Sequence, residues 1–141
     1  MPPITCHILD TTRGKPAADV VVAIYRISEL PMENSDEITI TENLPFGLAK
    51  TNKDGRVSEW IFNPKDNLES LGIKGQEWNT LKPGIYKIRF QTSKYFKQLI
   101  SDARTFFPFV DIMFNVSNPP DAHYHIPLLL ANHSYTTYRG S

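Results

Sequence analysis

The chain has 141 residues, of which 40% are hydrophobic and 21% charged, and its 15 basic residues balance its 15 acidic ones. These values are typical of one folded domain, so they exclude a wholly disordered chain, and the neutral charge offers no basic field for nucleic acid or an anionic membrane surface. No apolar run approaches the roughly 20 residues of a membrane-spanning helix, and a single cysteine excludes an internal disulfide framework.

The predicted strands are short runs separated by turn residues. Residues 4–9 alternate between apolar and polar, and residues 20–25 form a β-branched run that is typical of a strand. Residues 52–55 predict a hairpin turn, because Asp-Gly tolerates the positive φ that tight hairpins require, and residues 57–62 would form the return strand. Further strands are predicted at residues 85–90, 109–114, 123–130 and 135–139, with a weak one around 38–40.

One helix is predicted at residues 93–101, where apolar side chains recur at helical spacing. Seven to eight short strands with one short helix predict an all-β fold, an antiparallel β-sandwich. We expect one domain over residues 1–141, with two long polar loops at residues 28–48 and 63–82.

The predicted strand at residues 126–130 is apolar on both faces. Because a sandwich strand normally shows one face to water, this pattern favours contact with a second subunit, although a strand covered within one chain would show it too. Pro127 lacks an N–H for the sheet, which predicts an edge or a bulge at this position.

Three histidines lie on predicted strands. His123 and His125 share a face because they are two residues apart, and His7 lies in the first strand on the face of Thr5. Imidazole titrates near neutrality, so acid–base catalysis is one interpretation. A zinc site with all three histidines as ligands is another, and ordinary structural histidines are a third.

Other residues with reactive side chains have simpler explanations at this point. Cys6 and His7 point to opposite faces of their strand, so a nucleophile–base pair is excluded and Cys6 is expected in the core. Arg56 follows the predicted turn. It is either a solvated surface arginine, or its guanidinium binds a carbonyl, a developing oxyanion or a carboxylate. The aromatic C-terminal strand ending at Ser141 allows a docked tail.

Four separated blocks of the chain resemble the 5-hydroxyisourate hydrolases of the transthyretin-like family. They are residues 4–18, residues 51–56, residues 122–130 and the terminal tetrapeptide Tyr138, Arg139, Gly140 and Ser141. The blocks occur in the family's order, and the resemblance covers nearly the whole chain. It loosens in the two long loops, which look longer than those of compact members.

The resemblance implies a transthyretin-like sandwich that assembles as a homotetramer, a dimer of dimers with active sites where two dimers meet. It implies that His7, Arg56 and His125 are catalytic, and that the terminal tetrapeptide binds substrate. It implies no cofactor and no metal. His123 matches as well and would orient His125 or simply pack.

The reaction implied is the hydrolysis of 5-hydroxyisourate to 2-oxo-4-hydroxy-4-carboxy-5-ureidoimidazoline in urate degradation. The main alternative is a non-catalytic small-ligand carrier of the transthyretin type. A third is an interaction module that uses acidic residues of the first long loop, for which a solvated loop is the simpler interpretation. We expect a cytoplasmic protein, since no targeting segment is evident, and peroxisomal import by another route stays open.

Overall fold

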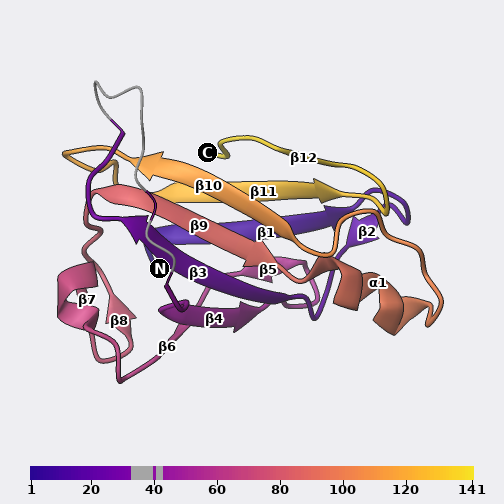
Figure 1. Cartoon of the computed structure of the whole chain (residues 1–141), viewed down its shortest axis with the longest axis horizontal. Helices are drawn as coiled ribbons and strands as arrows, with labels where there is room; N and C mark the ends of the chain where they lie inside the picture. Colours follow the sequence, from indigo (N-terminus) through magenta and orange to yellow (C-terminus); the bar gives the residue numbers. More distant parts are fainter. Residues whose placement is uncertain (33–39, 41–42) are drawn as a thin grey trace.

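The computed structural model describes residues 1–32, 40 and 43–141, in which two five-stranded sheets pack face to face (Figure 1). The β1 sheet contains, in hydrogen-bonded order, β12 (Tyr135–Thr137), β11 (Tyr124–Leu130), β1 (Ile4–Asp10) and β2 (Lys15–Pro16), with β5 (Arg56–Val57) also paired to β1. The β3 sheet contains β10 (Val110–Val116), β9 (Gly84–Phe90), β3 (Val21–Ser28), β4 (Gly47–Lys50) and β6 (Ile61–Phe62). The predicted β-sandwich is confirmed.

The core lies between the sheets because alternate residues of each long strand point inward. In β1 the side chains of Ile4, Cys6 and Ile8 are completely buried, and in β9 Ile88 and Phe90 are as well. The intervening residues of β9 are Lys87 and Arg89, which are only partly buried. This alternation is the pattern from which the strands were predicted.

The pairing of β1 with β11 is parallel, whereas the other pairs in the described residues are antiparallel. The β1 sheet is therefore mixed, a feature that the alternation in the sequence does not reveal. The register of β11 with β1 is continuous through Pro127, so the predicted bulge is absent. The pairing of β11 with β12 ends at Leu128, so Pro127 lies just beyond that ladder, and on this side the predicted edge is confirmed. The Pro127 carbonyl still accepts a hydrogen bond, from Thr137 Oγ1 at 2.8 Å.

The turn at residues 52–55 forms, but it does not close a hairpin. The Gly55 N–H donates to the Asn52 carbonyl at 2.9 Å, and Gly55 has a φ of +74°. The turn carries the chain from β4 in one sheet to β5 in the other, so the predicted return strand at residues 57–62 is split into β5 and β6. Between them Trp60 stays buried, and its indole N–H donates to the Ile4 carbonyl at 2.9 Å.

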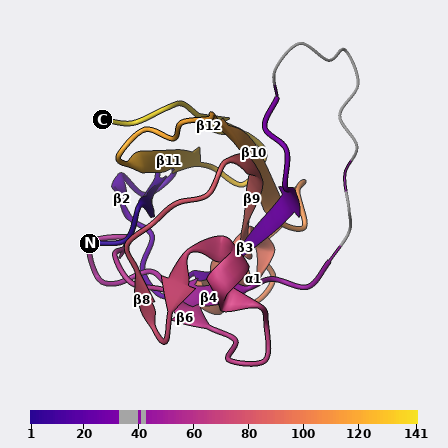
Figure 2. The same ribbon diagram turned by 90° about the vertical axis from the view of Figure 1, so that its left-hand side faces the viewer.

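The second long loop has structure of its own, which sequence patterning did not predict. It contains η1 (Leu68–Leu71, a 3₁₀ helix), β7 (Ile73–Lys74) and β8 (Glu77–Trp78). Figure 2 shows this unit at one end of the sandwich, where its Leu71, Ile73 and Trp78 are buried in the common core. The weak strand predicted around residues 38–40 falls mainly on residues 38 and 39, outside the described part of the chain.

Helix α1 (Thr92–Leu99) confirms the predicted helix within two residues at each end. It connects β9 to β10, and the buried Tyr95 ties it to the other sheet: the Tyr95 hydroxyl donates to Asp10 Oδ2 at 2.7 Å. Asp10 is fully buried and also accepts the backbone N–H of Arg13 at 3.0 Å. Burial, followed by the bond to Asp10, raises the pKa of Tyr95 to about 12. No helix in the described residues is long and apolar enough to cross a membrane.

The Tyr95–Asp10 contact predicts a stability effect. Replacing Tyr95→Phe removes one donor from a buried carboxylate, so the free energy of unfolding should fall by about 1–3 kcal/mol. Urea unfolding followed by far-ultraviolet circular dichroism measures this change. Tyr135→Phe is the control, because Tyr135 is exposed and surface changes cost about 0.5 kcal/mol or less. Equal losses in both variants would contradict the role of the contact.

Candidate active site

The outward face of the β1 sheet gathers the three side chains that the resemblance implies as catalytic. His7 lies opposite Arg56 in the β1–β5 pair, and Thr5 lies opposite His125 in the β1–β11 pair. Paired residues on neighbouring strands share a face, and residues two apart on one strand do too. His7, Arg56, Thr5 and His125 therefore project together, away from the core that Cys6 occupies.

The two candidate acid–base histidines face each other across a short gap. The ring centroids of His7 and His125 are 6.4 Å apart, and the ring planes are inclined by 26°. This separation is too long for a direct hydrogen bond between the rings. It suits one water molecule or one substrate oxygen held between them.

Thr5 holds His125 from the side. Its Oγ1 lies 2.8 Å from His125 Nδ1 and 3.0 Å from His123 Nε2, so one hydroxyl contacts both imidazoles. The rings of His123 and His125 are nearly parallel, with centroids 6.5 Å apart. Thr5 is 7% exposed, which makes this a largely dehydrated hydrogen-bonded group.

The surroundings of His7 and His125 favour the uncharged imidazole. Burial is the largest cause that lowers the pKa of each, and the positive charge of Arg56 is the second. For His125 the neighbouring His7 and His123 lower the pKa further, whereas the backbone and charge of Asp54 partly oppose the shift at His7. Both histidines are therefore neutral near pH 7 and able to accept a proton.

Two small pockets meet at His125. One, of about 210 Å³, is lined by Thr5, Arg56, His123, His125 and Ser141 among others. The other, of about 200 Å³, lies over β10 and β11 and includes His125, Tyr138 and Arg139 in its wall. The structure thus brings Ser141 beside Arg56 and His125, and it places Tyr138 and Arg139 on the other side of His125.

Gly140 fixes the C-terminal tail against β11. Its N–H donates to the His125 carbonyl at 2.9 Å, which forms an isolated antiparallel bridge three residues after the end of β12. A Cβ at position 140 would lie 2.7 Å from His125 Cδ2 and 3.1 Å from Pro127 Cγ. Only glycine allows the tail to come this close to the histidine ring.

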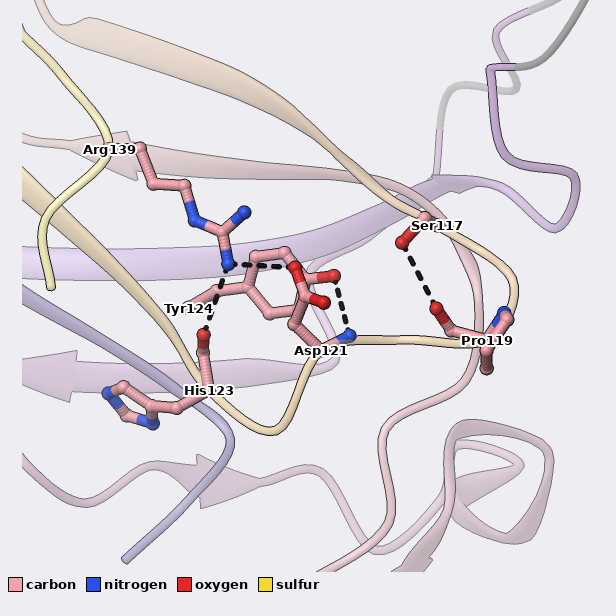
Figure 3. A network of polar contacts seen from close by, with 6 residues as sticks. All are labelled: Ser117, Pro119, Asp121, His123, Tyr124 and Arg139. Carbon is pink, nitrogen blue, oxygen red and sulfur yellow. Dashed lines mark hydrogen bonds and ion pairs between the residues drawn. The ribbon is translucent and has the colours of Figure 1, made fainter.

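Arg139 anchors the tail from its outer side (Figure 3). Its guanidinium forms an ion pair with Asp121 at 3.0 Å and lies 4.7 Å from the centre of the Tyr124 ring. The same nitrogen approaches the His123 carbonyl at 3.5 Å. These contacts anchor the tail, and the substrate contact that the resemblance implies for Arg139 stays a prediction.

The geometry of the sheet also bears on Cys6 and on the zinc site that the histidines allowed. Cys6 is fully buried on the core face and burial raises its pKa, so it is not placed to act as a nucleophile toward this site. Within the described residues no group of three His, Cys, Asp or Glu side chains is arranged to hold a metal ion. His123 Nε2 and His125 Nδ1 both face Thr5.

Thr5 is the residue that sequence reasoning did not single out. Alternation in the first strand placed Thr5 on the face of His7, and this was the only available signal. Its importance comes from the parallel register, which sets Thr5 opposite His125, a residue 120 positions away.

Known proteins match this chain over nearly its whole length. A model of the HIUase/Transthyretin family matches residues 4–140. The probable 5-hydroxyisourate hydrolase of Schizosaccharomyces pombe is 38% identical over 140 residues, which cover 99% of this chain and 92% of that protein.

Two solved structures resemble this chain. The 5-hydroxyisourate hydrolase of Klebsiella pneumoniae superposes with a TM-score of 0.65 at 25% identity, covering 98% of both chains. Sea bream transthyretin in complex with thyroxine gives a TM-score of 0.67 at 20% identity, covering 98% of this chain and 94% of that one, which shows the shared fold. The chain therefore belongs to the HIUase/Transthyretin family.

Proposed function

We propose that this protein hydrolyses 5-hydroxyisourate to 2-oxo-4-hydroxy-4-carboxy-5-ureidoimidazoline in urate degradation, at the site formed by His7, Arg56 and His125. The relatives that carry this name support the substrate. The observation that carries the proposal is the pair of neutral imidazoles 6.4 Å apart, with a guanidinium beside them. A thyroxine-type carrier shares the fold but has no need of this arrangement.

The chemistry is the opening of a cyclic amide. A water molecule must lose a proton as it attacks the carbonyl carbon, and the leaving ring nitrogen must gain one. We assign both transfers to the pair of His7 and His125. One neutral imidazole accepts the proton from water and becomes a cation, and the pair then returns this proton to the leaving nitrogen, so both rings end neutral. General acid–base catalysis of this kind contributes roughly 10²- to 10⁴-fold to the rate.

Arg56 is suited to the charge that develops on the carbonyl oxygen. It is exposed in the isolated chain and starts β5 directly after the turn, so its guanidinium is free to contact substrate. A fixed cation next to a developing oxyanion stabilises the transition state more than the ground state. The same charge adds to the effect of burial in lowering the pKa of the two histidines.

The tail completes the pocket in this proposal. Ser141 and Tyr138 would form part of the substrate wall, whereas Gly140 and Arg139 would hold the tail in place. We also propose that the chain works as a homotetramer, a dimer of dimers that meets over the outward face of the β1 sheet. This face carries Leu9 and Leu129, which are only partly covered in the single chain.

The acid–base assignment predicts that His7→Asn and His125→Asn each lower kcat by about 10²- to 10⁴-fold. The assay follows the ultraviolet decay of 5-hydroxyisourate generated in the cuvette from urate and urate oxidase, corrected for the spontaneous rate. His133→Asn is the matched control, because His133 is exposed and lies outside the site.

Circular dichroism and gel filtration should show the same fold and size for all three histidine variants. Near-normal turnover in either site variant would remove that histidine from the mechanism. If the folded wild-type protein does not accelerate the decay at all, the carrier alternative becomes the better one.

The lowered pKa values of His7 and His125 predict a specific pH dependence. Both rings should titrate below pH 6.5, the ordinary histidine value, so kcat/KM should hold as the pH falls toward 6.5 and decline only below it. Because the unfolded chain binds these protons at higher pH than the folded one, stability should also fall as the pH drops below 6.5.

Nuclear magnetic resonance of the imidazole Cε1 protons measures the two titrations directly. Arg56→Gln should raise both midpoints, since it removes a positive charge near the rings. Arg56→Lys keeps the charge and serves as the control. Unchanged midpoints in Arg56→Gln would show that Arg56 does not act on the histidines.

The anchor of the tail gives a further prediction. Arg139→Ala should lower kcat/KM by about ten- to a hundredfold, because a loosened tail misplaces the pocket wall. Thermal stability should change little, since an exposed ion pair contributes about 1 kcal/mol at most. Arg104→Ala, at another exposed arginine, is the control. Full activity of Arg139→Ala would show that the anchor does not support turnover.

A further inference from the structure

The position of one proton decides whether His125 can act as a base. A neutral imidazole carries its proton on either Nδ1 or Nε2, and only the other nitrogen has a lone pair to accept a proton. Nδ1 of His125 faces Thr5 Oγ1 at 2.8 Å. The group that binds Nδ1 therefore determines what Nε2 can do.

The Thr5 hydroxyl cannot donate a hydrogen bond to both His123 and His125. A hydroxyl has one proton to donate and two lone pairs that accept. With His125 Nδ1 at 2.8 Å and His123 Nε2 at 3.0 Å, Thr5 donates to one imidazole, and the other must donate to Thr5 to keep its hydrogen bond. The tautomers of the two histidines are coupled through this single hydroxyl.

We propose that Thr5 is a positioning residue that sets the tautomer of His125: its oxygen accepts the Nδ1–H of His125 and its proton goes to Nε2 of His123. This leaves the lone pair of His125 on Nε2. The inference rests on the proposed function, because it specifies how one of the proposed acid–base residues is prepared. His123 then serves as the acceptor that orients the Thr5 hydroxyl.

Proton balance favours this direction over the reverse. When His125 Nε2 takes a proton from water, the ring becomes a cation that carries protons on both nitrogens. Its Nδ1–H still donates to Thr5, so the hydrogen bond persists through the transfer and the Thr5 hydroxyl keeps its direction. In the reverse arrangement Thr5 would donate to Nδ1, the neutral ring would carry its proton on Nε2, and no lone pair would remain there for water.

The local structure keeps the hydroxyl in place. Threonine is branched at Cβ, which restricts its χ1 rotation. Thr5 is 7% exposed within β1, and its register with His125 belongs to a seven-residue parallel pairing. A stiff, nearly buried hydroxyl held by two sheet strands is well suited to orient a neighbouring ring.

The test is ¹⁵N nuclear magnetic resonance of the histidine ring nitrogens, recorded without substrate at a pH where His125 is neutral. In the wild-type protein we expect a protonated Nδ1 and an unprotonated Nε2 on His125. Thr5→Val keeps the shape but removes the hydroxyl, so His125 should show a mixture of tautomers. Thr5→Ser should restore the wild-type spectrum.

The same variants are then assayed with 5-hydroxyisourate. In Thr5→Val we expect kcat to fall about ten- to a hundredfold, as when a partner that orients a functional histidine is removed, with a smaller change in KM. Thr5→Ser should regain most of kcat. Thr92→Val is the matched control, because Thr92 is also buried but begins α1 beyond the β3 sheet. It should leave both the spectrum and kcat unchanged.

An unprotonated Nδ1 on wild-type His125 would overturn the inference. So would a folded Thr5→Val variant with the wild-type tautomer and kcat, or a folded Thr5→Ser variant that restores neither. Failure of the wild-type protein to hydrolyse 5-hydroxyisourate would instead overturn the proposed function, since control of the tautomer by Thr5 is read without substrate.

Discussion

The parallel register between β1 and β11 is the constraint on which the site depends. It sets Thr5 against His125 and His7 against Pro127, and so brings together residues from the two ends of the chain. A shift by one residue would turn the histidine side chains from the outward face into the core. The buried residues Ile8 and Leu128 oppose such a shift, because each fills the core only in the present register. Core packing and site geometry are thus fixed by the same pairing.

The electrostatic character of the site follows from its place on the sheet. The outward face is partly buried, and this burial lowers the pKa of His7 and His125. The chain crosses from one sheet to the other just before β5, which places Arg56 beside the two imidazoles. The arginine has two effects in the proposed site: it adds to burial in lowering the pKa of the histidines, and it would offer positive charge to the substrate. Placing the cation on a short strand after a tight turn limits its freedom without burying it.

Much of the fold could be predicted from the sequence, because alternation and turn residues are local signals. The sandwich, the long strands and the helix near residues 93–101 were predicted on this basis. Local signals could not show that β1 pairs with β11 in parallel, or that the turn before Arg56 joins two sheets. The small unit of η1, β7 and β8 was missed because its elements are too short to show a period. The shared face of His7 and Thr5 was readable, but the proximity of His125 came from the family resemblance alone, and its bond to Thr5 required the structure.

The unit of η1, β7 and β8 at the end of the sandwich also gives the protein an intrinsic fluorescence signal. Trp78 packs edge-on against Phe46 and Phe62, with ring centres 5.5 Å and 5.6 Å apart, and Trp60 is buried in the same core cluster. These are the two tryptophans of the chain. The tryptophan fluorescence of the chain therefore originates in the core, around Trp78 and Trp60, and not among the imidazoles. Loosening of this end would alter the tryptophan emission, whereas a change confined to the outward histidine face would leave the emission unchanged.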